Sequence, residues 1–190
     1  MGANKLVKLS NITLTNGLAA ATESDEGNGG AITIAADSVL LLQSVTISDS
    51  ISQADAAGEG GGAIFTAGSL TITDGSLESN SVSGAAGNGG AIFVADGGSL
   101  TATGTSFTSN SAKRAGGALE VSANSTVQLT DVSMTDNLAG TNTDGVITGA
   151  PGNGGAIHTT GGTTSINGGF FTDNTAAREG GALWNNGPAT

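Results

Sequence analysis

The feature that most constrains this chain is a four-residue word, Gly-Gly-Ala followed by isoleucine or leucine, which recurs six times. Successive copies begin 26 to 38 residues apart. Words repeated at such a period are typical of solenoid proteins, in which each repeat buries its apolar side only by stacking on its neighbours. The copies are Gly29-Gly30-Ala31-Ile32, Gly61-Gly62-Ala63-Ile64, Gly89-Gly90-Ala91-Ile92, Gly116-Gly117-Ala118-Leu119, Gly154-Gly155-Ala156-Ile157 and Gly180-Gly181-Ala182-Leu183.

A second word follows each of the first five copies. It reads ISDS from Ile47, LESN from Leu77, FTSN from Phe107, MTDN from Met134 and FTDN from Phe171, and LTNG from Leu14 precedes the series. Aligning the segments on its apolar residue places apolar side chains in two further columns, separated by polar ones. Alternation at period two predicts half-buried strands, because a helix would need apolar residues three and four apart. The two columns are Val7, Leu40, Leu70, Leu100, Val127, Thr164 and Leu9, Leu42, Ile72, Ala102, Leu129, Ile166.

These patterns predict an all-β fold, a right-handed, single-stranded parallel β-helix of about six coils over residues 1–190. Each coil is expected to hold three short strands: the Gly-Gly-Ala strand, an SLTAT-type strand and an SFTSN-type strand. Stacked coils turn each apolar column into one continuous interior. The right hand is expected because crossovers between parallel strands are right-handed by strong default. We interpret the chain as one repeat domain, either part of a longer array or a self-stacking subunit.

The glycine doublets and the second-word asparagines are interpreted as architectural. Each coil must turn sharply at the same corner, where glycine tolerates positive φ and a side chain would collide with its copy in the next coil. Stacked asparagines at another corner are expected to form an amide ladder that bonds turn backbone. The asparagines are Asn80, Asn110, Asn137 and Asn174.

Composition excludes several classes of partner. A net charge of -11 opposes binding to nucleic acid or anionic lipid, since both need a cationic face. The chain has no cysteine, hence no disulfide or thiolate zinc site. No apolar run is long enough to insert into a membrane, and the first ten residues lack a signal-peptide pattern, so we expect any export signal to lie outside this sequence.

The stretch between the second word and the next glycine doublet varies in length, from SAKRA and TAARE to LAAATESDEGN and LAGTNTDGVITGAPGN. These variable loops are expected on one side of the solenoid, where binding usually occurs. Their acidic residues raise the alternative of loosely bound calcium, although the spacing of a dedicated calcium loop is missing and no other cofactor or metal is expected. These residues are Glu23, Asp25, Glu26, Asp55, Glu59 and Asp144.

One outward column is rich in rings. The residue after each Gly-Gly-Ala-Ile/Leu word must point away from the interior. In order, this column reads Thr33, Phe65, Phe93, Glu120, His158 and Trp184. Two interpretations stay open: a solvent-facing contact stripe of Phe65, Phe93, His158 and Trp184 for a protein, a sugar or a sister copy, or rings that lie under a loop and close a small satellite core.

Enzymatic chemistry is not predicted, and no catalytic residue is assigned. Some parallel β-helices cleave polysaccharides, which raises that activity by analogy only. The best carboxylate pair is Asp136 and Asp173, expected as stacked neighbours, because Asp74 and Asp131 are separated by a coil with Gly104. No convergent set of acid, base and nucleophile accompanies either pair. Outward threonines such as Thr71 raise ice binding, but we interpret them as β-propensity surface residues.

The combination of Gly-Gly-Ala-Ile/Leu with Phe-x-x-Asn resembles the passenger repeats of chlamydial polymorphic outer-membrane proteins, which are autotransporter adhesins, and of related repeat proteins from environmental bacteria. The clearest copy is Gly89-Gly90-Ala91-Ile92 with Phe107-Thr108-Ser109-Asn110. The sequence departs from the pattern where Gly17 and Ser50 replace asparagine and where Leu77 and Met134 replace phenylalanine.

The resemblance implies a β-helix at the outer membrane or outside the cell. We expect an adhesion or structural module that contacts a protein or glycan on a host or neighbouring cell. The runner-up is a subunit that assembles into an extracellular filament by end-to-end stacking, and a polysaccharide lyase or hydrolase is a lesser alternative.

Overall fold

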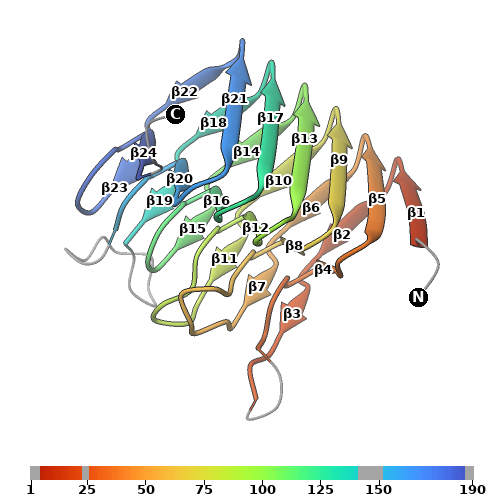
Figure 1. Ribbon diagram of the computed structural model, residues 1–190, viewed down its shortest axis with the longest axis horizontal. Coiled ribbons are helices and arrows are strands. Elements are labelled where there is room, and N and C mark those ends of the chain that lie inside the picture. Colours follow the sequence, from red (N-terminus) through yellow and green to blue (C-terminus); the bar gives the residue numbers. More distant parts are fainter. Residues whose placement is uncertain (1–4, 23–25, 141–151, 187–190) are drawn as a thin grey trace.

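The computed structural model describes residues 5–22, 26–140 and 152–186, and every regular element in these ranges is a β-strand. The strands form four parallel sheets of six, and each sheet takes one strand from each successive coil (Figure 1). We name the sheets A, B, C and D after the order of their first strands, β1, β2, β3 and β4. Along the chain, each coil contributes its strands to sheets D, A, B and C in that order, so that β4, β5, β6 and β7 form one coil.

Sheet A contains the longest strands: β1 (Lys5–Ser10), β5 (Ser38–Gln43), β9 (Ser69–Thr73), β13 (Ser99–Thr103), β17 (Thr126–Thr130) and β21 (Thr163–Asn167). Sheet B contains the second words: β2 (Thr13–Thr15), β6 (Thr46–Ser48), β10 (Ser76–Glu78), β14 (Ser106–Thr108), β18 (Ser133–Thr135) and β22 (Phe170–Thr172). Sheet C contains two-residue strands: β3 (Leu18–Ala19), β7 (Ile51–Ser52), β11 (Ser81–Val82), β15 (Ser111–Ala112), β19 (Leu138–Ala139) and β23 (Thr175–Ala176). Sheet D follows the glycine doublets: β4 (Ile32–Ile34), β8 (Ile64–Thr66), β12 (Ile92–Val94), β16 (Leu119–Val121), β20 (Ile157–Thr159) and β24 (Leu183–Asn185).

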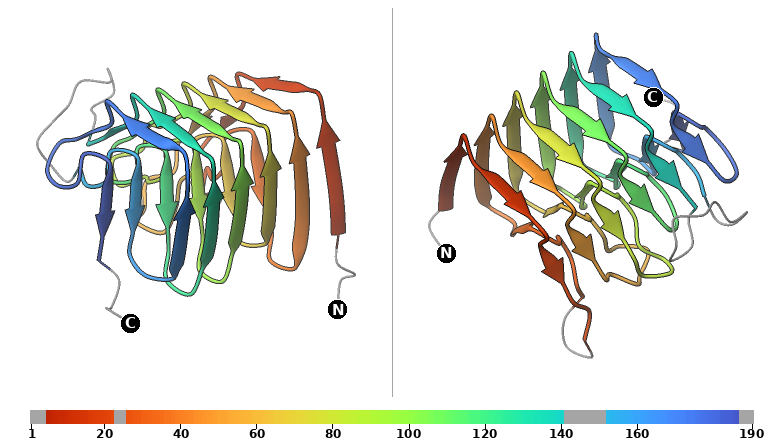
Figure 2. Two further views of the ribbon diagram at one scale, coloured as in Figure 1. Left: turned by 90° about the horizontal axis from the view of Figure 1, so that it is seen from above. Right: turned by 180° about the vertical axis from the view of Figure 1, so that it is seen from behind.

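The register between coils is the one that the repeated words predict. Leu70 pairs with Leu40 on one side and with Leu100 on the other, and Leu77 pairs with Ile47 and Phe107. Each predicted apolar column is therefore a vertical row of neighbours, and the predicted parallel solenoid of about six coils is confirmed. The coils follow one another along the long axis, with β1 and β24 at opposite ends of the stack (Figure 2).

The coil differs from the prediction in having four strands instead of three. Sheet C is the addition, and its strands contribute two residues each, directly after the second word. A two-residue strand is too short to display a period-two pattern, so the alternation could not reveal it. Val82, Ala112 and Ala139 of this sheet are buried, but they lie outside the main apolar cluster.

The main core lies between sheets A, B and D. Its largest fully buried side chains include Phe107, Leu77, Ile72 and Leu119, each at most 1% exposed. Because equivalent residues stack directly on one another, the interior is a continuous apolar column along the coils. The core therefore depends on every coil placing an apolar residue at the same height.

We expect Ile72→Val to lower the free energy of unfolding by about 1 kcal/mol, because it removes one buried methylene from this column. Thr101→Val is the matched control, because Thr101 lies on an exposed, outward position of the same sheet and should change stability by less than about 0.5 kcal/mol. Denaturant melts followed by circular dichroism measure both values. Equal effects at the two positions would contradict the assignment of the inward face.

The two glycines of each doublet are required for different reasons. Gly89 has φ of 65°, a conformation that L side chains rarely adopt. Gly90 has ordinary φ, but a Cβ atom there would overlap the carbonyl oxygen of Gly117 in the next coil. The first glycine therefore makes the turn, and the second lets neighbouring coils approach each other.

The asparagines that end the second words form a buried amide ladder. Asn110 Nδ2 donates to Asn137 Oδ1 in the next coil and to the Leu77 carbonyl oxygen in the preceding one, both at 3.0 Å. Its Oδ1 accepts from the backbone nitrogen and from Nδ2 of Asn80, again at 3.0 Å. Every hydrogen-bonding position of this amide is thus occupied, as burial at 0% exposure requires.

The variable connections lie on one edge of the solenoid, as predicted. In every coil they join a sheet C strand to the following sheet D strand, for example residues 53–63 between β7 and β8 and residues 113–118 between β15 and β16. They appear together along the lower edge of the stack in Figure 1. This edge is the part of the coil whose length differs most from one repeat to the next.

Candidate contact surface

The ring-rich column runs along sheet D in the predicted register. Phe65 pairs with Phe93, Phe93 with Glu120, Glu120 with His158 and His158 with Trp184. None of the five belongs to the main apolar cluster, although their strand neighbours Ile64, Ile92, Leu119 and Ile157 do. The column therefore lies on the side of sheet D away from the main core, as alternation in a strand requires.

Two ring pairs stack along this column. The Phe65 and Phe93 rings have centroids 5.5 Å apart and an interplanar angle of 10°. The His158 and Trp184 rings are closer, with centroids 4.5 Å apart and an angle of 3°. Parallel stacking follows from the fold, because equivalent residues of neighbouring coils are held one above the other.

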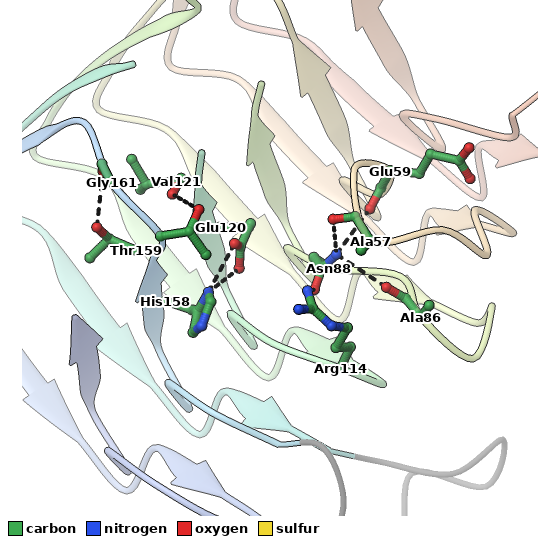
Figure 3. A network of polar contacts seen from close by, with 11 residues as sticks. Ala57, Glu59, Ala86, Asn88, Arg114, Glu120, Val121, His158, Thr159 and Gly161 are labelled. Atoms are coloured by element: carbon green, nitrogen blue, oxygen red, sulfur yellow. Dashed lines mark hydrogen bonds and ion pairs between the residues drawn. The ribbon is translucent and has the colours of Figure 1, made fainter. Parts of the chain in front are cut away.

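Glu120 and His158 form a buried pair between these stacks. His158 Nδ1 lies 2.7 Å and 2.9 Å from the two carboxylate oxygens of Glu120, and the two residues are only 2% and 3% exposed (Figure 3). Burial raises the pKa of Glu120 above its ordinary value of 4.5, against the opposing effects of His158 and of the more distant Arg114. The carboxyl group therefore holds its proton to a higher pH than an exposed glutamate does.

Neither of the two interpretations of this column holds for all four of its rings. Phe93 and His158 are buried, as the satellite-core interpretation proposes, whereas Phe65 and Trp184 are half-buried. The chain entering sheet D runs alongside the column and contacts two of its members. Thr33 Oγ1 donates to the Asn28 carbonyl oxygen, and Trp184 Nε1 donates to Glu179 Oε2, in both cases five residues back.

The segments that lead into the sheet D strands also stack on one another from coil to coil, as the strands do. Isolated bridges link Gly60, Asn88, Ala115, Asn153 and Glu179 in that order. Arg114 reaches back one coil and donates from a guanidinium nitrogen to Asn88 Oδ1 at 2.9 Å (Figure 3). The buried Oδ1 of Asn153 has no hydrogen-bond partner. Neighbouring connections are therefore joined to each other by backbone bridges and by a side-chain contact, which alternation within a strand does not predict.

The acidic residues that suggested calcium have local roles where the structure describes them. Glu59 Oε2 accepts from the backbone nitrogens of Asp55 and Ala56, and Asp55 Oδ1 accepts from the Ala86 nitrogen. Glu26 accepts from the Asn28 side chain. Glu23, Asp25 and Asp144 lie outside the described residues. Within residues 5–22, 26–140 and 152–186, no group of three or more His, Cys, Asp or Glu side chains is placed to hold a metal ion.

The stacked aspartates that were the best acid-base pair occupy turns. Asp136 and Asp173 are exposed and have φ of 56° and 54°, and Asp74 and Asp131 have φ of 51° and 50°. Asn, Asp and Gly are the residues that tolerate this left-handed conformation best. Turn geometry alone therefore explains these aspartates.

A comparison with protein-family models matches a short segment near the C-terminal end of the stack. Residues 167–186 match the Chlamydia polymorphic membrane protein repeat. The matched segment spans β22, β23 and β24 and includes the word FTDN and the last Gly-Gly-Ala-Leu. The segment is thus similar to one such repeat, and the paired register places the equivalent residues of the other coils in the same columns. The comparisons with curated proteins and with solved structures find no match. In the described part of the chain, no helix is long and apolar enough to cross a membrane.

Proposed function

We propose that this chain is a contact module of a cell-surface protein, and that it binds a protein or glycan of a host or neighbouring cell without chemical turnover. The observation that carries the proposal is the polymorphic membrane protein repeat at residues 167–186, within a solenoid whose equivalent columns run the length of the stack. The name of that repeat associates it with membrane proteins of Chlamydia.

The proposed contact surface is the edge where sheet C strands connect to sheet D strands. Its segments differ in length while the coils beneath them keep a common register, which suits variable recognition on a constant scaffold. The half-buried rings of Phe65 and Trp184 lie beside this edge and offer partly accessible aromatic faces. Aromatic side chains are enriched where proteins bind partners.

The experiment replaces residues 53–63 by the sequence of residues 113–118. Both segments start after a sheet C strand and end in Gly-Gly-Ala, so the coil should still close. The labelled full chain and this variant are applied to a glycan array and to cultured animal cells, with Thr101→Ala on sheet A as the matched surface control. We expect the shortened variant to keep the melting temperature of the parent and lose at least about half of its binding, and Thr101→Ala to bind normally.

Binding that survives shortening of both 53–63 and 83–91, or that is lost equally in Thr101→Ala, would contradict the proposed edge. Release of new sugar ends from any polysaccharide on incubation with the chain would replace the proposal with an enzymatic function.

A second candidate is end-to-end assembly of copies. The outermost coils expose apolar side chains whose equivalents in inner coils are buried: Val7 in β1 pairs with the buried Leu40, and Leu183 in β24 pairs with the buried Ile157. End-to-end stacking would place β1 to β4 of one copy on β21 to β24 of another. Light scattering over a concentration series tests this candidate: growth with concentration supports it, and a constant monomer mass contradicts it.

A further inference from the structure

A chain of side-chain contacts links the last three coils outside the main core. Glu120 in β16 contacts His158 in β20, the His158 ring stacks on Trp184 in β24, and the Trp184 indole nitrogen donates to Glu179 Oε2 at 2.9 Å. Both members of the central pair are buried. Coils nearer the N-terminus have phenylalanine or threonine at these positions, so the titratable contact is confined to one end of the stack.

The charges around this contact are few. The sheet D neighbour on the N-terminal side, Phe93, is apolar, and the neighbour on the C-terminal side is the Trp184 ring. Arg114, from the connection before β16, acts on Glu120 from a distance. Glu179, from the connection before β24, binds the far edge of Trp184. A Glu120 carboxylate that loses its proton here is therefore buried between the Phe93 ring and the His158 imidazole.

We propose that the buried contact between Glu120 and His158, called the latch below, stabilises the packing of the C-terminal coils on the rest of the solenoid. This packing is more stable at mildly acidic pH than at alkaline pH. The inference goes beyond the proposed function, because it concerns regulation of the fold and holds whichever surface makes the cellular contact.

The direction follows from proton linkage. In the folded chain the pKa of Glu120 is raised above 4.5 by burial, so over the interval between these two values the folded state holds a proton that the open or unfolded state has released. The stabilisation is complete below the ordinary value and is lost as the pH rises through the raised one. At higher pH the pair retains a buried carboxylate, and the desolvation of this charge destabilises the folded state in which the C-terminal coils are packed on the stack.

Hydrogen exchange measures this latch inside one molecule. The backbone nitrogens of Ala118 and Leu119 donate to the Ala156 carbonyl oxygen, across the junction between β16 and β20 that the Glu120–His158 contact joins, and those of Ala63 and Ile64 donate to the Ala91 carbonyl oxygen in the same way. The first pair reports on the junction with the latch, and the second is its equivalent in coils without the latch. As the pH rises from 4.5 into the alkaline range, we expect protection of Ala118 and Leu119 to fall about tenfold relative to Ala63 and Ile64.

Two side chains make the readout specific without any substitution, because the chain contains one tryptophan and one histidine. The emission of Trp184 and the ring resonances of His158 are expected to change over the same pH interval as the amide protection. In Glu120→Gln, which keeps the side-chain shape and removes the charge, the relative fall should disappear. In the control Asp136→Asn, which removes an exposed turn carboxylate at a position that accepts asparagine, the fall should remain.

The latch is overturned if the two amide pairs of the unsubstituted chain lose protection in parallel, or if Glu120→Gln folds and retains the full difference between them. Should Glu120→Gln fail to fold, the unsubstituted chain still decides: a relative fall that coincides with changes at His158 and Trp184 supports the latch, and a fall without them refutes it. None of these results bears on cell or glycan binding.

Discussion

Replacing Gly90 by alanine is expected to lower the free energy of unfolding by about 3 kcal/mol or more. The new Cβ atom would overlap the Gly117 carbonyl oxygen and lie 2.5 Å from the Ser111 nitrogen. Both atoms are backbone, so relief requires the coils to separate and not merely a side chain to rotate. Denaturant melts of the purified protein measure the change.

Gly58→Ala is the matched control for this substitution. Nothing lies within 4 Å of a Cβ atom built on Gly58, and its φ is not in the left-handed region. Loss of backbone freedom in the unfolded chain should leave this variant as stable as the parent or up to about 1 kcal/mol more stable. Similar destabilisation by the two substitutions would show that the doublet glycine is not a site of close approach between coils.

Asn110→Ala is expected to cost about 3 to 5 kcal/mol, although it shortens a turn side chain without disturbing the apolar core. It removes four hydrogen bonds of 3.0 Å, two donated by Nδ2 and two accepted by Oδ1. The partners left behind are buried and have no access to water, so their lost bonds are not replaced.

Asn167→Ala provides the comparison, because Asn167 is exposed at the end of β21 and its replacement removes the same amide group at a position outside the ladder. It should alter stability by less than about 0.5 kcal/mol. Thermal and denaturant unfolding of both variants give the two values. A cost below about 1 kcal/mol for Asn110→Ala would mean that the ladder accompanies the fold without stabilising it.

Much of this architecture could be predicted from the sequence because a solenoid repeats one set of requirements. The same word at each corner fixes which residues are equivalent, and period-two alternation fixes which of them face inward. The pairing of Leu70 with Leu100, and of Leu77 with Phe107, follows from these two facts alone. Strand pairing in most sheets lacks such a marker of register.

The rest depends on features that repetition does not encode. The two-residue strands of sheet C show no alternation, and the burial of Phe93 and His158 on the outward side of sheet D does not follow from period-two alternation. The Glu120–His158 contact was within reach of sequence reasoning, because the predicted register already placed an acid and an imidazole as stacked neighbours.

The central claim, that equivalent residues of successive segments are vertical neighbours, is tested most directly by cysteine cross-linking. The chain contains no cysteine, so pairs can be introduced on the outward face of sheet A, where Thr71 pairs with Thr101 and Thr101 with Gln128. Strands one coil apart are about 4.8 Å apart, within the range of a disulfide, whereas strands two coils apart are about 9.6 Å apart and beyond it. We predict rapid oxidation of Thr71→Cys/Thr101→Cys and of Thr101→Cys/Gln128→Cys and none of Thr71→Cys/Gln128→Cys; failure of the adjacent pairs, or equal oxidation of all three, would contradict the stacked-coil structure.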